Sequence, residues 1–183
     1  MVLMTASCKT VSLTPKQHTF PDPVDTSSKP IDLQEKKTYS TNGVYASNEF
    51  DGARLNDFTQ INDTTFRATI LPENEPINES AYFGFQLWSD SKRNIDLELY
   101  YPNHVHRYIP KLSYDANEWM FMDTLSFDTL KGPELATLRL SLDRRRLYVT
   151  GSELQTSSYN VQWSKSISEN SGVDYSVIGK SKL

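Results

Sequence analysis

Alternating apolar and polar positions are most regular near the middle of the chain, at residues 82–101. Ile95, Leu97, Leu99 and Tyr101 are separated by Asp96, Glu98 and Tyr100. This period of two predicts a strand with one face on a core and the other in water. Residues 82–88 are almost wholly apolar and aromatic, so we expect both faces of that strand to be covered. Polar residues 89–94 lie between the two strands, which predicts a hairpin at the centre of an antiparallel sheet.

Further strand patterns, separated by turn residues, extend from residue 39 to residue 154. The expected strands cover residues 44–50, 53–61, 65–71, 104–109, 118–122, 138–142 and 147–150. Asp51-Gly52 and Asn62-Asp63 mark turns between them. This region has no convincing helical pattern. About eight short strands with turns between them predict an all-β fold, an antiparallel β-sandwich or jelly roll.

The pattern changes near the C-terminus. Tyr159, Trp163 and Ile167 recur at the spacing of one helix face, which predicts a helix over residues 157–169. Ser157 or Ser158 is placed to cap its first turn. Residues 170–172 end the helix, and residues 173–179 predict a new strand. A helix and a strand after an all-β region indicate that a second domain begins at residue 155.

The N-terminal residues are of a different kind. Residues 1–8 form a short apolar run that ends in small residues and Cys8. They resemble part of a bacterial lipoprotein signal peptide, which implies that Cys8 carries a lipid. An ordinary free thiol is the alternative, because no Lys or Arg precedes the run. Residues 9–38 are rich in Pro, Ser, Thr, Asp and Lys, which predicts a disordered linker.

Two stretches together resemble one family. The aromatic strand at residues 82–85 is followed by the alternating strand and then by Tyr108, Pro110, Ser113, Asp115 and Trp119. This region resembles the small β-sandwich domain that precedes the catalytic domain in zinc carboxypeptidases of the cytosolic-carboxypeptidase-like branch. The C-terminal helix, with Val177-Ile178-Gly179-Lys180-Ser181 after it, resembles the start of that catalytic domain. The resemblance implies a β-sandwich accessory domain at residues 39–154 and the first helix and strand of a truncated α/β peptidase domain at residues 155–183.

The family's zinc ligands are not found in this chain. In that family a His-x-x-Glu pair and a distant His hold zinc, which activates water for peptide hydrolysis. The residues three positions after His18, His104 and His106 are Pro21, Arg107 and Ile109. The resemblance implies that the ligands lie beyond Leu183. We therefore assign no catalytic and no metal-binding residue here, and we expect zinc only in the full-length parent.

A few residues could carry chemistry by themselves, although each has a plainer explanation. His104 and His106 would share a strand face and could bind a metal, or simply form a polar surface. Consecutive arginines at 144–146 could bind an anion or form a solvated turn. Trp88, Trp119 and Tyr101 could stack on a sugar or pack in the core. Asp96 and Glu98 are expected on opposite or solvent faces, so acid/base catalysis has no support.

Composition excludes several classes of partner. The chain has 183 residues, a formal net charge of −4 and one cysteine. Its length suits one domain with extra segments. The acidic balance argues against binding to nucleic acid or to an anionic membrane surface. No run reaches the roughly 20 apolar residues of a membrane span, so we expect membrane contact only through a lipid on Cys8.

The family resemblance implies that this chain is the N-terminal accessory domain of a zinc metallocarboxypeptidase that removes C-terminal residues from peptides. We expect this chain to be inactive alone. Its partner would be the downstream catalytic domain of the same polypeptide, and a peptide would be the substrate of the parent. We expect a bacterial cell envelope protein, lipid-anchored or secreted, with the cytoplasm as the alternative. The alternative function is a cell-surface β-sandwich module that binds carbohydrate or protein, and a third is a stand-alone metal enzyme built on His104 and His106.

Overall fold

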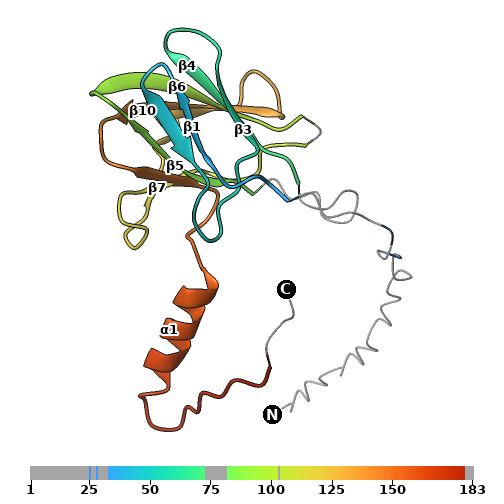
Figure 1. The fold of residues 1–183 in the computed structure, drawn as a ribbon, viewed down its shortest axis with the longest axis vertical. Helices are drawn as coiled ribbons and strands as arrows, with labels where there is room; N and C mark the ends of the chain where they lie inside the picture. The colour runs from blue at the N-terminus through green and yellow to red at the C-terminus, as the bar shows by residue number, and fades with distance from the viewer. Residues whose placement is uncertain (1–24, 26–27, 29–32, 73–81, 103, 180–183) are drawn as a thin grey trace, which may run out of the picture.

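The fold is mostly β-sheet, as the sequence predicts. The computed structural model describes residues 25, 28, 33–72, 82–102 and 104–179. These residues form eleven strands, one α-helix and one short 3-10 helix (Figure 1). In chain order they are β1 (Thr38–Thr41), β2 (Val44–Ser47), β3 (Asp57–Gln60), β4 (Thr65–Thr69), β5 (Gly84–Ser89), β6 (Arg93–Tyr100), β7 (Lys111–Ser113), β8 (Met120–Phe121), η1 (Thr124–Ser126), β9 (Phe127–Asp128), β10 (Leu135–Leu142), β11 (Leu147–Thr150) and α1 (Ser157–Ile167).

The strands form two sheets. One has six strands in the order β1-β2-β5-β11-β7-β8, and the other has five in the order β3-β4-β6-β10-β9. Neighbouring strands are antiparallel except β4 and β6, which run parallel, for example with Phe66 beside Leu97. The expectation of a wholly antiparallel arrangement is therefore wrong for this one pair. A parallel pair needs a long connection, and here residues 70–92, which include β5, supply it.

One apolar core lies between the two sheets. Alternate residues of the strands point into it, because successive side chains of a strand face opposite sides of a sheet. The largest fully buried side chains include Phe66, Phe83, Phe85 and Tyr101. Strands of both sheets contribute to the same cluster, with Val44, Leu87 and Val149 from the six-stranded sheet and Leu97 and Leu138 from the five-stranded sheet. The two layers are therefore held together by burial of one continuous apolar surface.

The predicted central hairpin does not exist. β5 pairs with β2 and β11, whereas β6 pairs with β4 and β10 in the other sheet. The polar turn between them carries the chain from one sheet to the other. Ser89 N donates to Asp143 O at 2.8 Å, and Asp90 N donates to Gly43 O at 3.0 Å, which fixes this crossing. Two apolar strands joined by a polar turn fit a hairpin and a crossing equally well, so the local pattern does not decide between them.

Two other expected strands are absent. Residues 104–109 alternate between half-buried and exposed but pair with no strand. Pro102 and Pro110 bracket this segment and lack the N–H group that a ladder needs, and its one bond to a neighbouring segment among the described backbone contacts joins His106 N to Pro133 O at 2.7 Å. Residues 173–179 are exposed and irregular, because no strand lies beside them in the described structure.

The first hairpin is set by its turn residues. Asn42 and Gly43 join β1 to β2, with φ angles of 48° and 70°. Two positive φ angles in a two-residue loop suit the right-handed twist of the strands, and Asn-Gly adopts them at low cost. Ordered structure also begins before Tyr39, the expected start of the domain, since Gln34 and Lys37 already hydrogen bond to Asn48.

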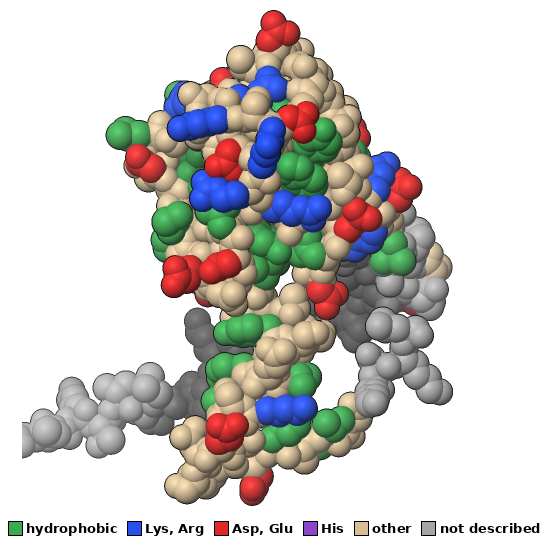
Figure 2. Space-filling model, turned by 60° about the vertical axis from the view of Figure 1, so that its left-hand side comes forward, with side chains coloured by type: hydrophobic (Ala, Val, Ile, Leu, Met, Phe, Trp, Pro, Cys, Tyr) green, Lys and Arg blue, Asp and Glu red, His purple; other side chains and the backbone are tan. Residues whose placement is uncertain are grey.

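The C-terminal helix forms as predicted, although its cap is one residue earlier. The Thr156 side chain, rather than Ser157 or Ser158, accepts a hydrogen bond from Tyr159 N at 3.1 Å. No residue of α1 is buried. Tyr159 is 47% exposed and Trp163 is 53% exposed. Figure 2 shows hydrophobic side chains on the helix below the β-rich body. Among the described helices, none is long and apolar enough to cross a membrane.

Candidate functional site

The segment that joins β11 to α1 runs between two hollows on the surface. The larger has a volume of about 570 Å³ and the smaller about 290 Å³. Leu154 lines both, so we call the two together the linker hollows. Gly52, Tyr82, Lys111, Ser152, Glu153 and Gln155 also line the larger. Phe50, Asp51, Ala116, Asn117, Tyr148, Thr156, Ser158, Tyr159 and Gln162 line the smaller.

Aromatic contacts shape the wall of the smaller hollow. Tyr148 lies between the core residues Leu147 and Val149 in β11, so its ring points away from the core. The Phe50 ring packs edge-on against Tyr148 at 5.3 Å, and the Trp119 ring does so at 6.3 Å. Edge-to-face packing of this kind is favourable and directional. It holds together two loops that are distant in the sequence.

Polar groups in the larger hollow are already paired. Lys111 Nζ lies 2.8 Å from Glu153 Oε1 and 4.8 Å from the centre of the Phe121 ring. The Tyr82 hydroxyl donates to Gly52 O at 3.1 Å. Burial raises the pKa of Tyr82 to about 12, so its hydroxyl stays protonated at neutral pH. Tyr82, Lys111 and Glu153 are therefore engaged in a hydrogen bond and an ion pair, and a protonated, already bonded tyrosine does not favour proton transfer in this hollow.

The described residues hold no metal site. Within residues 25, 28, 33–72, 82–102 and 104–179, no three or more His, Cys, Asp or Glu side chains are grouped to bind a metal ion. His106 Nδ1 lies 2.9 Å from the Tyr101 hydroxyl, and its Nε2 contacts Tyr108 O. Both ring nitrogens are thus in use. The expected pairing of His104 and His106 on one strand face is wrong, because no strand forms there.

His106 should make stability fall in weakly acidic solution. Phe83, Tyr101 and Phe127 surround its ring, with centroids 5.2 to 5.8 Å away. Burial lowers the pKa of His106, against a smaller opposing effect of the bond to Tyr108. The folded pKa is therefore below the unfolded value of about 6.5, so this contribution to stability is present above pH 6.5 and is lost as the pH falls through that value toward the folded pKa.

The measurement is the midpoint temperature of thermal unfolding, for the wild type and for His106→Phe, between pH 7.5 and pH 5. We expect the wild-type midpoint to fall more than that of the variant. The ring proton signals of His106, followed by NMR, should titrate below the ordinary histidine pKa of about 6.5. A His106 that titrates at or above the ordinary value would contradict this prediction, whether or not the variant folds.

The arginine turn is not an open anion site. Arg144 Nε donates to Asp90 O at 2.7 Å, and Arg145 Nη2 lies 2.7 Å from Asp143 Oδ2. Arg146 donates to Gln86 Oε1 at 3.0 Å and lies 4.5 Å from the centre of the Trp88 ring. Each of the three arginines thus has a protein partner, which fits the plainer of the two explanations.

The three aromatic residues considered for sugar stacking lie in different places. Tyr101 is 1% exposed in the core. Trp88 stacks on Tyr45 at 5.4 Å and 9°, with Arg146 on its ring. Trp119 packs edge-on against Tyr148, and its Nε1 donates to Ala116 O at 3.1 Å. They form no common flat platform.

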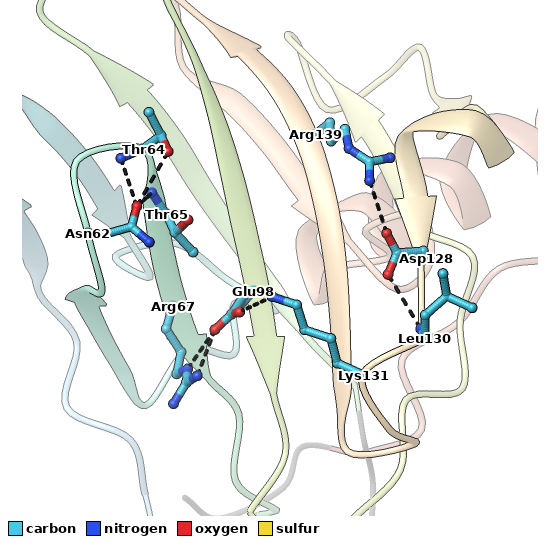
Figure 3. A network of polar contacts seen from close by, with 9 residues as sticks. All are labelled: Asn62, Thr64, Thr65, Arg67, Glu98, Asp128, Leu130, Lys131 and Arg139. Atoms are coloured by element: carbon cyan, nitrogen blue, oxygen red, sulfur yellow. Dashed lines mark hydrogen bonds and ion pairs between the residues drawn. The ribbon is translucent and has the colours of Figure 1, made fainter.

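One carboxylate differs from its predicted environment. Glu98 was expected to face solvent or the opposite side from Asp96, but it is only 4% exposed. Its Oε2 accepts from Arg67 Nη2 at 2.7 Å, and its Oε1 accepts from Lys131 Nζ at 2.8 Å (Figure 3). Residues this far apart in the sequence give no local signal of such a pairing. The lining of the linker hollows was missed for the same reason, since four separate segments supply it.

Cys8, the one residue assigned a modification, lies outside the described residues, as does most of the expected linker at residues 9–38.

Comparison with known proteins shows what this fold is similar to. No protein-family model and no curated protein matches the sequence. Among solved structures, the chain is similar to a metallo-carboxypeptidase from Burkholderia cenocepacia, with a TM-score of 0.53, 11% identity, 70% of this chain covered and 34% of that chain. For a protein named as a carboxypeptidase A from Shewanella denitrificans, the TM-score is 0.53 and the identity is 14%, with 67% of this chain and 33% of that chain covered. For a protein named as a carboxypeptidase from Burkholderia mallei, the TM-score is 0.53 and the identity is 12%, with 69% of this chain and 33% of that chain covered.

The chain spans about a third of the length of these three structures. Identities of 11% to 14% show a shared fold and nothing beyond it. About two thirds of this chain thus shares its fold with one part of these carboxypeptidase chains.

Proposed function

We propose that this chain is the accessory β-sandwich domain of a zinc metallocarboxypeptidase, followed by the first helix of the peptidase domain and by residues that would form a strand only beside the downstream polypeptide. The observation that supports this most is the fold likeness, which covers 67% to 70% of this chain but only 33% to 34% of the three carboxypeptidase structures. The resemblance of residues 82–119 and 157–181 to that family points the same way. The role of this piece would be to pack beside the catalytic domain and shape the entrance for a peptide substrate.

Exposed apolar side chains support a missing partner for α1. Tyr159 and Trp163 lie on one face of the helix and are 47% and 53% exposed. Val177 and Ile178, farther along, are 64% and 100% exposed. Large side chains exposed in a row are characteristic of interaction surfaces. In our proposal the downstream catalytic domain covers this row, and the linker hollows lie at the junction.

Zinc chemistry would belong to the downstream domain. The described residues contain no grouped metal ligands, so the proposal assigns the His-x-x-Glu pair and the distant His to polypeptide beyond Leu183. A lipid on Cys8 would hold the protein at the bacterial cell envelope, with a secreted or a cytoplasmic protein as the alternatives. The linker after Cys8 would let the folded body stand away from that surface.

The test compares two polypeptides. One is the 183-residue chain, and the other continues with whatever the coding DNA specifies after Leu183. We expect only the longer one to release C-terminal residues from a peptide with a free carboxylate, and we expect a zinc chelator to stop it. A coding sequence without His-x-x-Glu after Leu183, or a longer protein without this activity, would defeat the proposal.

A matched pair of substitutions tests the proposed junction. Trp163→Lys in the longer polypeptide should expose α1 to proteolysis and lower activity, because a charge would be placed in an apolar contact. Asn160→Lys lies on the same helix but at a polar exposed position. It should change neither the proteolysis of α1 nor the activity.

The alternative of a cell-surface binding module is not favoured. It would need coplanar exposed rings on one face, and Tyr101 is buried whereas Trp88 is covered by Tyr45 and Arg146.

A further inference from the structure

Residues 104–109, which we call the His106 segment, are held to the rest of the molecule by few backbone bonds. His106 N donates to Pro133 O at 2.7 Å, and His104 N donates to Tyr101 O at 3.2 Å. Among the described residues, these are the only backbone–backbone hydrogen bonds that the segment makes. Side-chain contacts therefore hold most of the segment in place.

The His106 ring lies in an apolar pocket, and both of its nitrogens are in use. The rings of Phe83, Tyr101 and Phe127 lie 5.2 to 5.8 Å from it, centre to centre. Nε2 contacts Tyr108 O. A carbonyl oxygen only accepts, so Nε2 carries the proton of the neutral ring, and the Tyr101 hydroxyl donates to Nδ1 at 2.9 Å. A second proton on Nδ1 would leave the hydroxyl of Tyr101, which is 1% exposed, without an acceptor.

No described carboxylate is placed to balance a positive charge on the His106 ring. The titratable and charged residues on the surrounding segments are Tyr82, Tyr101, His104, Arg107, Tyr108, Asp128, Lys131 and Glu134. The two acidic residues of this set are occupied elsewhere. Asp128 Oδ2 lies 3.3 Å from Arg139 Nη2, and the Glu134 carboxylate lies beside Gly132. A protonated His106 is therefore more stable when its ring has left the pocket and entered water.

Tyr108 connects His106 to the linker between β11 and α1, residues 151–156. The Tyr108 ring packs on Gly151, where a Cβ atom would lie only 3.0 Å from it. Gly151 N also donates to Phe83 O at 2.9 Å. The linker borders both linker hollows and leads into α1 (Figure 1). No residue of α1 is buried, so the position of the helix depends largely on how firmly this linker is held.

We infer that His106 is an acid-sensitive switch that controls how firmly the linker to α1 is held. At neutral pH the ring stays in its pocket and Tyr108 covers Gly151. In acid the protonated ring leaves, the His106 segment opens, and Gly151 loses its cover. Histidine is the side chain suited to such a switch, because its charge changes between pH 5 and pH 8.

The sign of the effect follows from burial. Burial lowers the pKa of His106 in the closed form, whereas the ring of the opened segment has the ordinary value of about 6.5. The closed form is therefore favoured above pH 6.5 and loses up to about 10-fold in its equilibrium constant per pH unit below it, until the pH reaches the folded pKa. The switch goes beyond the proposed function and does not rest on it, because all its contacts lie within this chain.

Amide hydrogen exchange of the 183-residue chain, followed by NMR at pH 7.5 and pH 5, tests the switch. Protection factors, which correct for the intrinsic pH dependence of exchange, are compared. The reporters are three amides that donate one hydrogen bond each at this end of the molecule: His106 N to Pro133 O, Gly151 N to Phe83 O and Met122 N to Pro110 O. The reference is Ser89 N, which donates to Asp143 O at 2.8 Å at the other end of β5. We expect protection at the reporters to fall about 5-fold or more relative to that at Ser89.

Two variants separate the switch from a general effect of acid. In His106→Phe, whose ring cannot be protonated, reporter protection should fall no more than that of Ser89. His104→Gln removes the other histidine of the segment and should keep the wild-type response. The inference is overturned by a wild type in which Gly151 loses no more protection than Ser89, a result that does not depend on whether either variant folds. An unchanged response in a folded His106→Phe, or a lost response in a folded His104→Gln, also overturns it.

Discussion

Replacing Asn48 with alanine is expected to lower the free energy of unfolding by about 3 kcal/mol, because four buried or partly buried hydrogen bonds are lost at once. Asn48 is fully buried. Its Oδ1 accepts from Lys37 N at 2.7 Å. Its Nδ2 lies 2.8 Å from both Glu35 O and Leu55 O, and 3.0 Å from Gln34 Oε1. This amide fastens the segment before β1 to the loop before β3.

Urea unfolding at neutral pH measures the effect. Asn56→Ala is the matched control, since Asn56 is half-buried and accepts one bond, from Leu71 N at 2.8 Å. We expect that variant to lose about 1 kcal/mol. If the two variants lose equal stability, then the four contacts of Asn48 do not act together as described. Asn48→Ala should also make residues 33–37 more sensitive to proteases than the rest of the body.

Local patterns in the sequence identify elements, and the structure supplies their neighbours. The alternation at Ile95, Leu97 and Leu99 correctly predicts a strand with a buried face, and the spacing of Tyr159 and Trp163 correctly predicts a helix. The same alternation does not say which strand lies beside β6. The polar turn after β5 was therefore interpreted as a hairpin, although it crosses between sheets.

The candidate site was less predictable than the fold. Lys111 and Glu153 form an ion pair across 42 positions of the sequence. The Asn48 side chain contacts Lys37, which precedes it in the chain, and Leu55, which follows it. Neither contact has the spacing of a helix or a strand, so neither could be predicted from a short stretch of sequence. A strand pattern at residues 173–179 also predicted a paired strand, and here the pairing partner is missing. A strand forms only when its backbone groups find a ladder.

Removing Arg67 is the second substitution with a large expected effect. We expect Arg67→Met to lower the free energy of unfolding at pH 7 by about 2 kcal/mol, less than for a fully buried pair, because Lys131 still contacts Glu98 and Arg67 is itself partly exposed. Arg67 Nε and Nη2 lie 3.0 and 2.7 Å from Glu98 Oε2. The guanidinium also lies 4.9 Å from the centre of the Tyr100 ring. Methionine keeps much of the apolar stem, so the loss reports mainly on the charge.

The pH dependence separates this effect from lost packing. Burial raises the pKa of Glu98, but hydrogen bonds from Lys131 and Arg67 outweigh it, so the pKa is lowered overall. The folded pKa is therefore below the unfolded value of about 4.3, and this contribution is present above that pH and is lost as the pH falls through the folded pKa. The difference between wild type and Arg67→Met should then shrink below about pH 4.

Arg139→Met supplies the control for this series. Arg139 Nη2 lies 3.3 Å from Asp128 Oδ2 on the same sheet, and its side chain is 57% exposed. Since exposed ion pairs contribute little, we expect a loss of about 0.5 kcal/mol or less. Urea unfolding of both variants at pH 7 and pH 3.5 gives the comparison. A loss for Arg67→Met that stays constant over this range would mean that its contact with Tyr100, and not its charge on Glu98, stabilises the sheet.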